Sequence, residues 1–335
     1  MKRAASITEI HVVNDRPDPL FCQSPARCDF HDEDGCSRRE FNRLPDKEKE
    51  RVLRDIYGIE DPVYETPHIV RDGLDRMDKL LLDRVEKKTS LQLVRDHFPS
   101  FFENEAFRLQ FLRVDSFDVK QATNSLVRHL EKKLELFGPD KIDKKITLDD
   151  LSEDDLDFMG SGGFQVVPEK DRGGRHVIFS NHRKWKYKEV NNMLRCMWYL
   201  LMVLVEESGN NICDTVEISY NLGPYCAGDF DRTGLKSSFD LLKAIPTRLV
   251  GYHYCFDDVR FRTVWGVIAV FLGKKSRMRA RDHEGSHVEC RYGLMSYGIP
   301  VDALSITVDG FEDNSKFLKW LEGRQCTKNR STVED

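Results

Sequence analysis

The chain carries one sequence motif that could bind a catalytic metal. Residues 283 to 287 spell H-E-x-x-H. On a helix, His283 and His287 would share one face and bind zinc, with Glu284 beside the zinc-bound water, as in a zinc hydrolase. However, Arg279, Arg281 and Asp282 precede the motif, where such a helix should be apolar, and Gly285 favours a helix that begins only inside the motif. We therefore expect no bound metal, and the zinc hydrolase is the least favoured alternative.

Other residues with metal-binding or nucleophilic chemistry form no recognised pattern. Near the N-terminus, Cys22, Cys28, His31 and Cys36 lack the paired C-x-x-C spacing of zinc sites. The nine cysteines are scattered and odd in number, which favours reduced thiols and a cytoplasmic protein. Neither a nucleophile elbow nor a phosphate-binding glycine loop is found. The sequence thus predicts no catalytic residue, no cofactor and no enzymatic activity.

A run of cations lies just before the H-E-x-x-H motif. It contains Lys274, Lys275, Arg277, Arg279 and Arg281. In a strand the three arginines would share one face, because side chains alternate. One interpretation is an edge strand whose charges face solvent and prevent aggregation. The other is a basic patch that contacts anionic lipid headgroups and places the protein transiently on a membrane surface.

The cationic run follows a strand-like segment and an unusually apolar helix. Residues 249–256 carry aromatic side chains at a period of two, and Asp257 and Asp258 then offer helix N-caps. Residues 259–272 carry apolar side chains at spacings of three and four, in a stripe wider than a surface helix needs. Two interpretations remain open: a buried core helix, or a movable lid over an apolar ligand cavity.

The rest of the chain divides into regions of different patterning. Residues 1–45 are polar and indicate a partly disordered tail, whereas 46–147 carry several helical apolar stripes that predict a helical N-terminal subdomain. Residues 148–173 are acidic and glycine-rich, which indicates a linker or an elaborated loop. Residues 174–312 alternate strand-like and helix-like segments as βαβαβ, which favours an α/β sheet with helices packed on it. Residues 313–335 are expected to form a C-terminal helix and tail.

Three segments resemble the CRAL-TRIO lipid-binding domains of retinaldehyde-binding, tocopherol-transfer and phosphatidylinositol-transfer proteins. The helical segment 109–122 and the strand segment 170–179 are similar to two family elements, in the family's order. The third pattern is Pro, an acidic residue, Arg, Leu, a strand, then Phe, three residues, Trp, five residues and Phe-Leu. Its positions are occupied here by Pro246, Arg248, Leu249, Phe261, Trp265, Phe271 and Leu272. The resemblance covers residues 91–309 and is carried by the three motifs together.

The resemblance implies a CRAL-TRIO-like bowl of mixed β-sheet with flanking helices, which holds one hydrophobic molecule or lipid under the lid helix 259–272. The positions where phosphatidylinositol-binding members carry polar readers hold Asp115, Ser116, Thr247 and Ala269 here. Asp115 and Ser116 stand in place of a basic pair, Thr247 in place of an acidic residue and Ala269 in place of a lysine. The loss of these cations argues against inositol phospholipid recognition of that type. The ligand-binding candidates are Tyr220, Tyr252, Tyr254, Phe261, Val264, Trp265, Ile268, Phe271 and Leu272.

Composition limits the remaining function classes. The 335 residues carry a net charge of −5, which gives no reason to expect a nucleic acid partner. The longest apolar run, 196–205, is too short to span a bilayer. The leading hypothesis is therefore a cytoplasmic, non-catalytic protein that binds a lipid in an apolar cavity and carries or presents it at membranes, with peripheral membrane association. The alternative is a regulatory or scaffold domain of the same fold without a ligand.

Overall fold

The computed structural model describes residues 40–58, 65–86, 88–223 and 231–331. The cysteines and histidine of the N-terminal tail named above (Cys22, Cys28, His31 and Cys36) lie outside this part of the chain. The N-terminal helices are α2 (Asp46–Tyr57), α3 (Pro67–Val85), α4 (Thr89–His97), α5 (Pro99–Phe102), α6 (Glu105–Val114) and α7 (Val119–Phe137).

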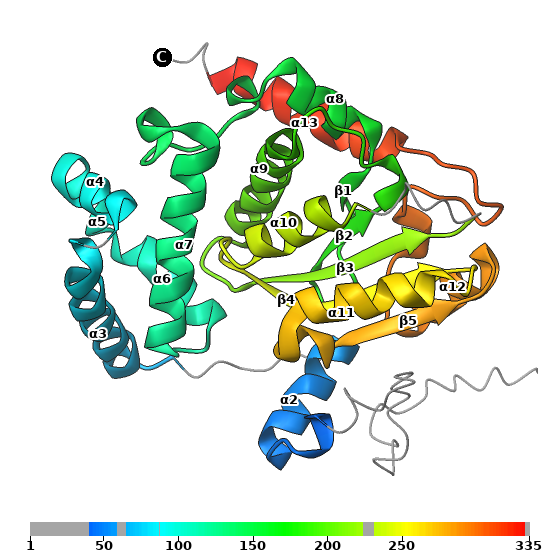
Figure 1. Cartoon of the computed structure of the whole chain (residues 1–335), viewed down its shortest axis with the longest axis horizontal. Coiled ribbons are helices and arrows are strands. Elements are labelled where there is room, and N and C mark those ends of the chain that lie inside the picture. The colour runs from blue at the N-terminus through cyan, green and yellow to red at the C-terminus, as the bar shows by residue number, and fades with distance from the viewer. Residues whose placement is uncertain (1–39, 59–64, 87, 224–230, 332–335) are drawn as a thin grey trace, which may run out of the picture.

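Helices α3 to α7 pack around their own apolar core and form the cyan and blue-green group of Figure 1. The sequence fixes where several of them begin. The side chains of Thr66, Asn104 and Asp118 each accept a hydrogen bond from a backbone N–H in the first turn of α3, α6 and α7. Such caps satisfy donors that the helix itself leaves unpaired. These helices occupy the region where the apolar stripes predict them.

A five-stranded sheet forms the second half of the molecule. Its strands are β1 (Phe164–Val167), β2 (His176–Ser180), β3 (Cys213–Asn221), β4 (Thr247–Phe256) and β5 (Ala280–Glu284), in that spatial order. β1 is antiparallel to β2, and the other neighbours are parallel. The protein is therefore a mixed α/β protein, as the sequence predicts.

Three helices connect the parallel strands: α9 (Val190–Ser208), α10 (Arg232–Leu242) and α11 (Phe261–Arg277). Because such crossovers are right-handed and the strand order advances in one direction, all three helices lie on the same face of the sheet, as Figure 1 shows. The opposite face is covered by α12 (His287–Ser296) and the 3-10 turn η5 (Val301–Ala303).

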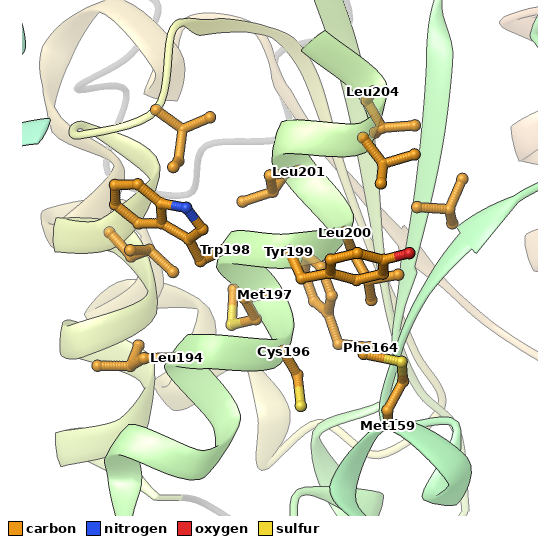
Figure 2. Close-up of a cluster of buried hydrophobic side chains, with 14 of the residues drawn as sticks. Met159, Phe164, Leu194, Cys196, Met197, Trp198, Tyr199, Leu200, Leu201 and Leu204 are labelled. Atoms are coloured by element: carbon orange, nitrogen blue, oxygen red, sulfur yellow. The ribbon is translucent and has the colours of Figure 1, made fainter. Parts of the chain in front are cut away.

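Helix α9 supplies most of the central core. Nearly every residue from Met193 to Val205 is buried, and Figure 2 shows the resulting cluster. Trp198 is 1% exposed, and its ring lies 4.6 Å from His129 and 6.0 Å from Phe137 of α7, centre to centre. The helical half and the sheet half are thus joined by buried aromatic contacts. Within the described residues, no helix is long and apolar enough to cross a bilayer.

The linker expected at 148–173 is wrong. This segment contains the 3-10 turn η2 (Leu148–Asp150), helix α8 (Glu153–Ser161) and strand β1. Its acidic residues serve as caps and ion-pair partners: Asp155 is fully buried and accepts hydrogen bonds from Arg195 and Asn192 of α9. Acidity here marks a helix N-terminus, which favours negative charge. Helix α13 (Ser315–Ser331) packs near β1 at the C-terminal end of the chain.

The edge strand expected for the cationic run is confirmed only at its end, because Arg281 lies on the edge strand β5, whereas Lys274, Lys275 and Arg277 lie on α11. Helix α11 continues to Arg277, with an interruption at Gly273, whose φ of 71° and ψ of 172° are not helical. Strand β5 begins only at Ala280 and pairs with β4 through Glu284. Lys and Arg are good helix formers that suit a helix C-terminus, which explains why the helix extends through part of this run.

Candidate functional site

The candidate site is the face of the sheet that α11 covers. Strands β3 and β4 are in register, so that Glu217 pairs with Tyr252 and Ser219 with Tyr254, and these four side chains share one face. The Trp265 ring of α11 stacks on this face, 6.1 Å from Tyr252 and 5.5 Å from Tyr254 between ring centres. Helix α11 thus rests on β4 through aromatic contacts.

Most of the ligand-binding candidates predicted from the sequence come together here. They form one apolar cluster with Leu235 and Phe239 of α10. Its predicted members are Tyr252, Tyr254, Phe261, Val264, Trp265, Ile268, Phe271 and Leu272.

Tyr220 does not belong to this group, and its assignment is corrected. It pairs with Cys255 and lies on the opposite sheet face, because alternate residues of β3 point to opposite sides. Its hydroxyl lies 2.9 Å from Nδ1 of His287 at the start of α12. Aromatic character alone marked Tyr220 as a candidate, whereas the register of β3 decides its face.

Sequence reasoning missed a row of buried polar side chains on the same face. Ser180, Glu217, Ser219 and Asn221 are each at most 4% exposed, and His182 follows β2 at 8%. Asn221 Nδ2 donates to the Ser219 hydroxyl at 2.9 Å, and His182 Nδ1 lies 3.4 Å from the same oxygen. The signal in the sequence is alternation of polar and apolar residues in β3, a pattern that ordinarily predicts a solvent-facing side. Here helices cover both sides.

Burial keeps this polar row uncharged near neutral pH. Burial raises the pKa of Glu217 to about 8 and lowers the pKa of His182 to about 4. At pH 7, Glu217 is therefore mostly a protonated carboxyl group and His182 a neutral imidazole. The site offers hydrogen-bond donors and acceptors without net charge.

Three atoms of the row have no hydrogen-bond partner among the described residues: the Ser180 hydroxyl, His182 Nε2 and Glu217 Oε2. A buried polar atom left unsatisfied costs about 1–3 kcal/mol. Together these atoms disfavour the closed arrangement by several kcal/mol, unless another molecule supplies the missing hydrogen bonds. Chemically, the row can bind a neutral polar group such as a hydroxyl or carbonyl.

The structure does not show the apolar cavity that the sequence predicts between the sheet and the lid helix. Helix α11 packs directly on β4 through Phe261, Val264 and Ile268, which are all buried. Cavities of about 620, 520 and 170 Å³ lie elsewhere: at the amino ends of β2 and β3, beside α12, and between α7 and α9. The physical reason is side-chain packing, because Leu235 and Phe239 of α10 and the inner face of α11 fill the space against β4.

The first turn of α11 differs from the expected one. Asp257 does not cap the helix, because it accepts a hydrogen bond from Gly223 N at 2.9 Å. Asp258 Oδ1 accepts a hydrogen bond from the Arg260 backbone N–H at 2.9 Å just before the helix, and the same carboxylate pairs with the Arg260 side chain. Arg262 pairs with Glu284 at the end of β5. The two arginines at this helix N-terminus, which the helix dipole disfavours, are therefore each paired with a carboxylate.

The predicted basic patch is not a free surface. Arg277 pairs with Glu40 at 2.7 and 2.8 Å, and Arg279 Nε donates to Asp55 at 2.7 Å. Arg281 is 6% exposed and donates to the carbonyl oxygens of Met278 and Ala280. Lys274 is exposed, and the side chain of Lys275 lies outside the described residues. The arginines thus contact protein rather than forming one strand face.

The H-E-x-x-H residues do not lie on one helix. His283 and Glu284 end β5, and His287 begins α12, which confirms that the motif spans two elements. His283 Nε2 lies 2.9 Å from Nδ1 of His253, whereas His287 contacts Tyr220. In the part of the chain that the structure describes, no group of three His, Cys, Asp or Glu side chains is placed to hold a metal ion.

Comparisons with known proteins add a distant likeness in fold. No protein-family model and no curated protein matches the chain. Among solved structures, it is similar to the crystal structure of Sfh5, with a TM-score of 0.45 and 12% sequence identity over 81% of this chain and 100% of that chain. At this TM-score the likeness carries no conclusion about function, and the fold class rests on the strands and helices described above.

Proposed function

We propose that this protein binds one hydrophobic molecule with an uncharged polar head between the sheet face and α11. The observation that carries the proposal is the buried polar row with three unpartnered atoms, from Ser180, His182 and Glu217. A ligand hydroxyl or carbonyl would satisfy them, and its apolar part would contact the aromatic side chains of β4 and α11. The neutral state of the row disfavours a charged headgroup, whose burial without a counter-charge is costly.

Helix α11 acts as the lid in this proposal. Its inner face is apolar, and Val270 on its outer face is 69% exposed. When the helix lifts, a ligand tail takes over contacts that α11 makes with Tyr252 and Tyr254. The apolar surface of β4 then stays covered, by the ligand tail instead of by α11. Opening therefore loses little of the roughly 25 cal/mol per Å² gained by burial. Release at a membrane, and cytoplasmic location with peripheral membrane association, stay predictions.

The second candidate function is a regulatory or scaffold domain that holds no ligand. It is favoured by the direct packing of Phe261, Val264 and Ile268 on the sheet. In that case the polar row would serve only to fix the register of the buried strands. The two candidates differ in one measurable property, the saturable binding of a hydrophobic probe.

The test uses the purified full chain and three fluorescent probes with the same long alkyl chain, ending in an alcohol, a carboxylate or a phosphate. We expect the alcohol to bind at about one per chain, at least tenfold more tightly than either anion at pH 7. Ser180→Ala removes one unpartnered hydroxyl and should weaken alcohol binding about tenfold. Val270→Ala, on the exposed side of the lid, is the matched control and should leave binding unchanged.

Two outcomes would contradict the proposal. No saturable binding of any probe would favour the ligand-free scaffold. Tighter binding of the phosphate than of the alcohol would place the ligand at a charged site away from the polar row.

A further inference from the structure

The N-terminal helix α2 packs against the C-terminal end of the lid. In Figure 1, α2 lies beside the end of α11 that leads to β5. Phe41, Val52 and Ile56 form a buried apolar cluster with Met278, the residue that follows α11. These contacts join segments more than 200 positions apart in the chain, and they lie outside the core that α3 to α7 form.

Two ion pairs reinforce this contact. Both carboxylate oxygens of Glu40 accept hydrogen bonds from Arg277, and both side chains are only 20% exposed. The Asp55 side chain is 3% exposed and pairs with Arg279 at 2.6 Å. Buried pairs of this kind are strongly destabilised when one partner is removed, because the other charge is left without compensation.

Asp55 also connects α2 to the start of the central strands. Its second carboxylate oxygen lies 3.7 Å from Arg248 at the beginning of β4, and its backbone carbonyl accepts a hydrogen bond from Arg175. Arg248 in turn forms two 2.7 Å hydrogen bonds with Asp214 of β3. Asp55 is therefore anchored to the sheet strands β3 and β4 while it pairs with Arg279, just beyond the end of α11.

The contacts of Glu40, Asp55 and the apolar cluster all lie on the C-terminal side of Gly273, and so they restrain the chain just after the lid. Gly273 has a φ of 71°, in the left-handed region that favours glycine, and it separates the lid from the turn that carries Arg277. Within the described residues, a Cβ at this position would meet no neighbouring atom within 4 Å. The glycine therefore meets a backbone requirement of the kind found at hinges.

We propose that α2 is a latch for the lid: it clamps the turn after Gly273 and thereby controls how readily α11 opens. This inference rests on the proposed role of α11 as a lid and adds a regulatory element to it. With α2 docked, the C-terminal end of α11 is fixed, and the lid moves only about Gly273. Release of α2 frees both sides of the hinge and lowers the cost of opening.

Hydrogen–deuterium exchange of the full chain, read by mass spectrometry, tests the latch without any ligand. In Asp55→Asn, amides of 261–272 should exchange about tenfold faster, as expected when a charge-assisted hydrogen bond that restrains opening is lost. Amides of α9 should not change. Glu50→Gln is the matched control, because Glu50 also lies on α2 and its ion pair in the described part of the chain is with Arg54 of the same helix, at an exposed position.

A second set of variants keeps the test valid if Asp55→Asn folds poorly. Glu40→Gln should also accelerate exchange of 261–272. Arg277→Glu should do so too, but it also removes the hydrogen bond from Arg277 to the Ala269 carbonyl of the lid, so Glu40→Gln is the decisive variant of the two. The double variant Glu40→Arg with Arg277→Glu reverses the pair and should restore slow exchange. Faster exchange confined to α2, with 261–272 unchanged in every variant, would overturn the latch.

The exchange result and probe binding separate this inference from the proposed function. If lid exchange responds to Asp55 and Glu40 but the alkyl alcohol never binds, the latch holds and the ligand proposal fails. If the alcohol binds while lid exchange ignores both substitutions, the ligand proposal holds and the latch is refuted.

Discussion

Replacement of Glu217 by glutamine should stabilise the protein at neutral pH. The carboxyl group lies on the covered sheet face, is 4% exposed, and burial raises its pKa to about 8. Glutamine has nearly the same shape and cannot ionise. The substitution therefore isolates the free energy that the titration of one buried carboxyl contributes.

The sign and size of the effect follow from linkage. Because the pKa of Glu217 is raised from 4.5 to about 8 on folding, the folded protein holds a proton that the unfolded chain releases between these pH values. The contribution of Glu217 to the free energy of unfolding is thus highest below about pH 4.5 and falls by about 1.4 kcal/mol per pH unit up to about pH 8. Relative to the native sequence, Glu217→Gln should gain about 3 kcal/mol between pH 5 and pH 7.

The assay is urea unfolding of both proteins at pH 5, 6, 7 and 8, followed by circular dichroism. The quantity of interest is the difference in unfolding free energy, because titrations of other groups cancel in it. Glu48→Gln, at an exposed position of α2, is the control and should show no pH-dependent difference. A constant difference across this range would mean that Glu217 is ionised in the folded protein, and the neutral polar row would be wrong.

Two further predictions concern the lid and the H-E-x-x-H motif. Trp265→Ala removes the ring stacked on Tyr252 and Tyr254, so it should lower the free energy of unfolding by up to about 3 kcal/mol and weaken alcohol-probe binding. Urea unfolding measures the first effect and probe titration the second. Unchanged probe binding would mean that the lid does not contact the ligand. A motif without metal would make His283→Ala nearly neutral for stability, but the loss of the contact with buried His253 should cost about 1–3 kcal/mol. Elemental mass spectrometry should find no stoichiometric zinc before or after the substitution, and one zinc per chain lost with His283 would restore the hydrolase hypothesis.

Local patterns predicted helices and strands well where the spacing of apolar residues agreed with the residues that begin or end an element. The apolar stripes of residues 46–147 predicted helices, and α2 and α7 lie in that region as expected. The alternation of strand-like and helix-like segments over 174–312 likewise predicted the mixed α/β class. Such features depend on side-chain spacing within one segment, which the sequence displays directly.

The sequence-based predictions were wrong where the role of a charged residue depends on a partner that is distant in the chain. The acidic run at 148–158 has the composition of a linker, yet Asp155 is buried because Arg195, forty positions away, neutralises it. The arginines at 277 and 279 look like a solvent-facing surface until Glu40 and Asp55 are placed beside them. A charge pattern in one segment does not reveal its counter-charges, and so these residues could not be assigned from local sequence.

The unequal restraints at the two ends of α11 imply a direction for its movement. At the N-terminal end, Arg262 and Glu284 form an ion pair whose side chains are 42% and 40% exposed, and such pairs contribute little because water screens them. At the C-terminal end, Arg279 and Asp55 are 14% and 3% exposed, so water screens that pair far less. The lid should therefore open first at its N-terminal end and turn about Gly273. That movement would uncover the carboxyl ends of β3 and β4, where the buried polar row begins, and a ligand would meet its hydrogen-bonding groups as it enters.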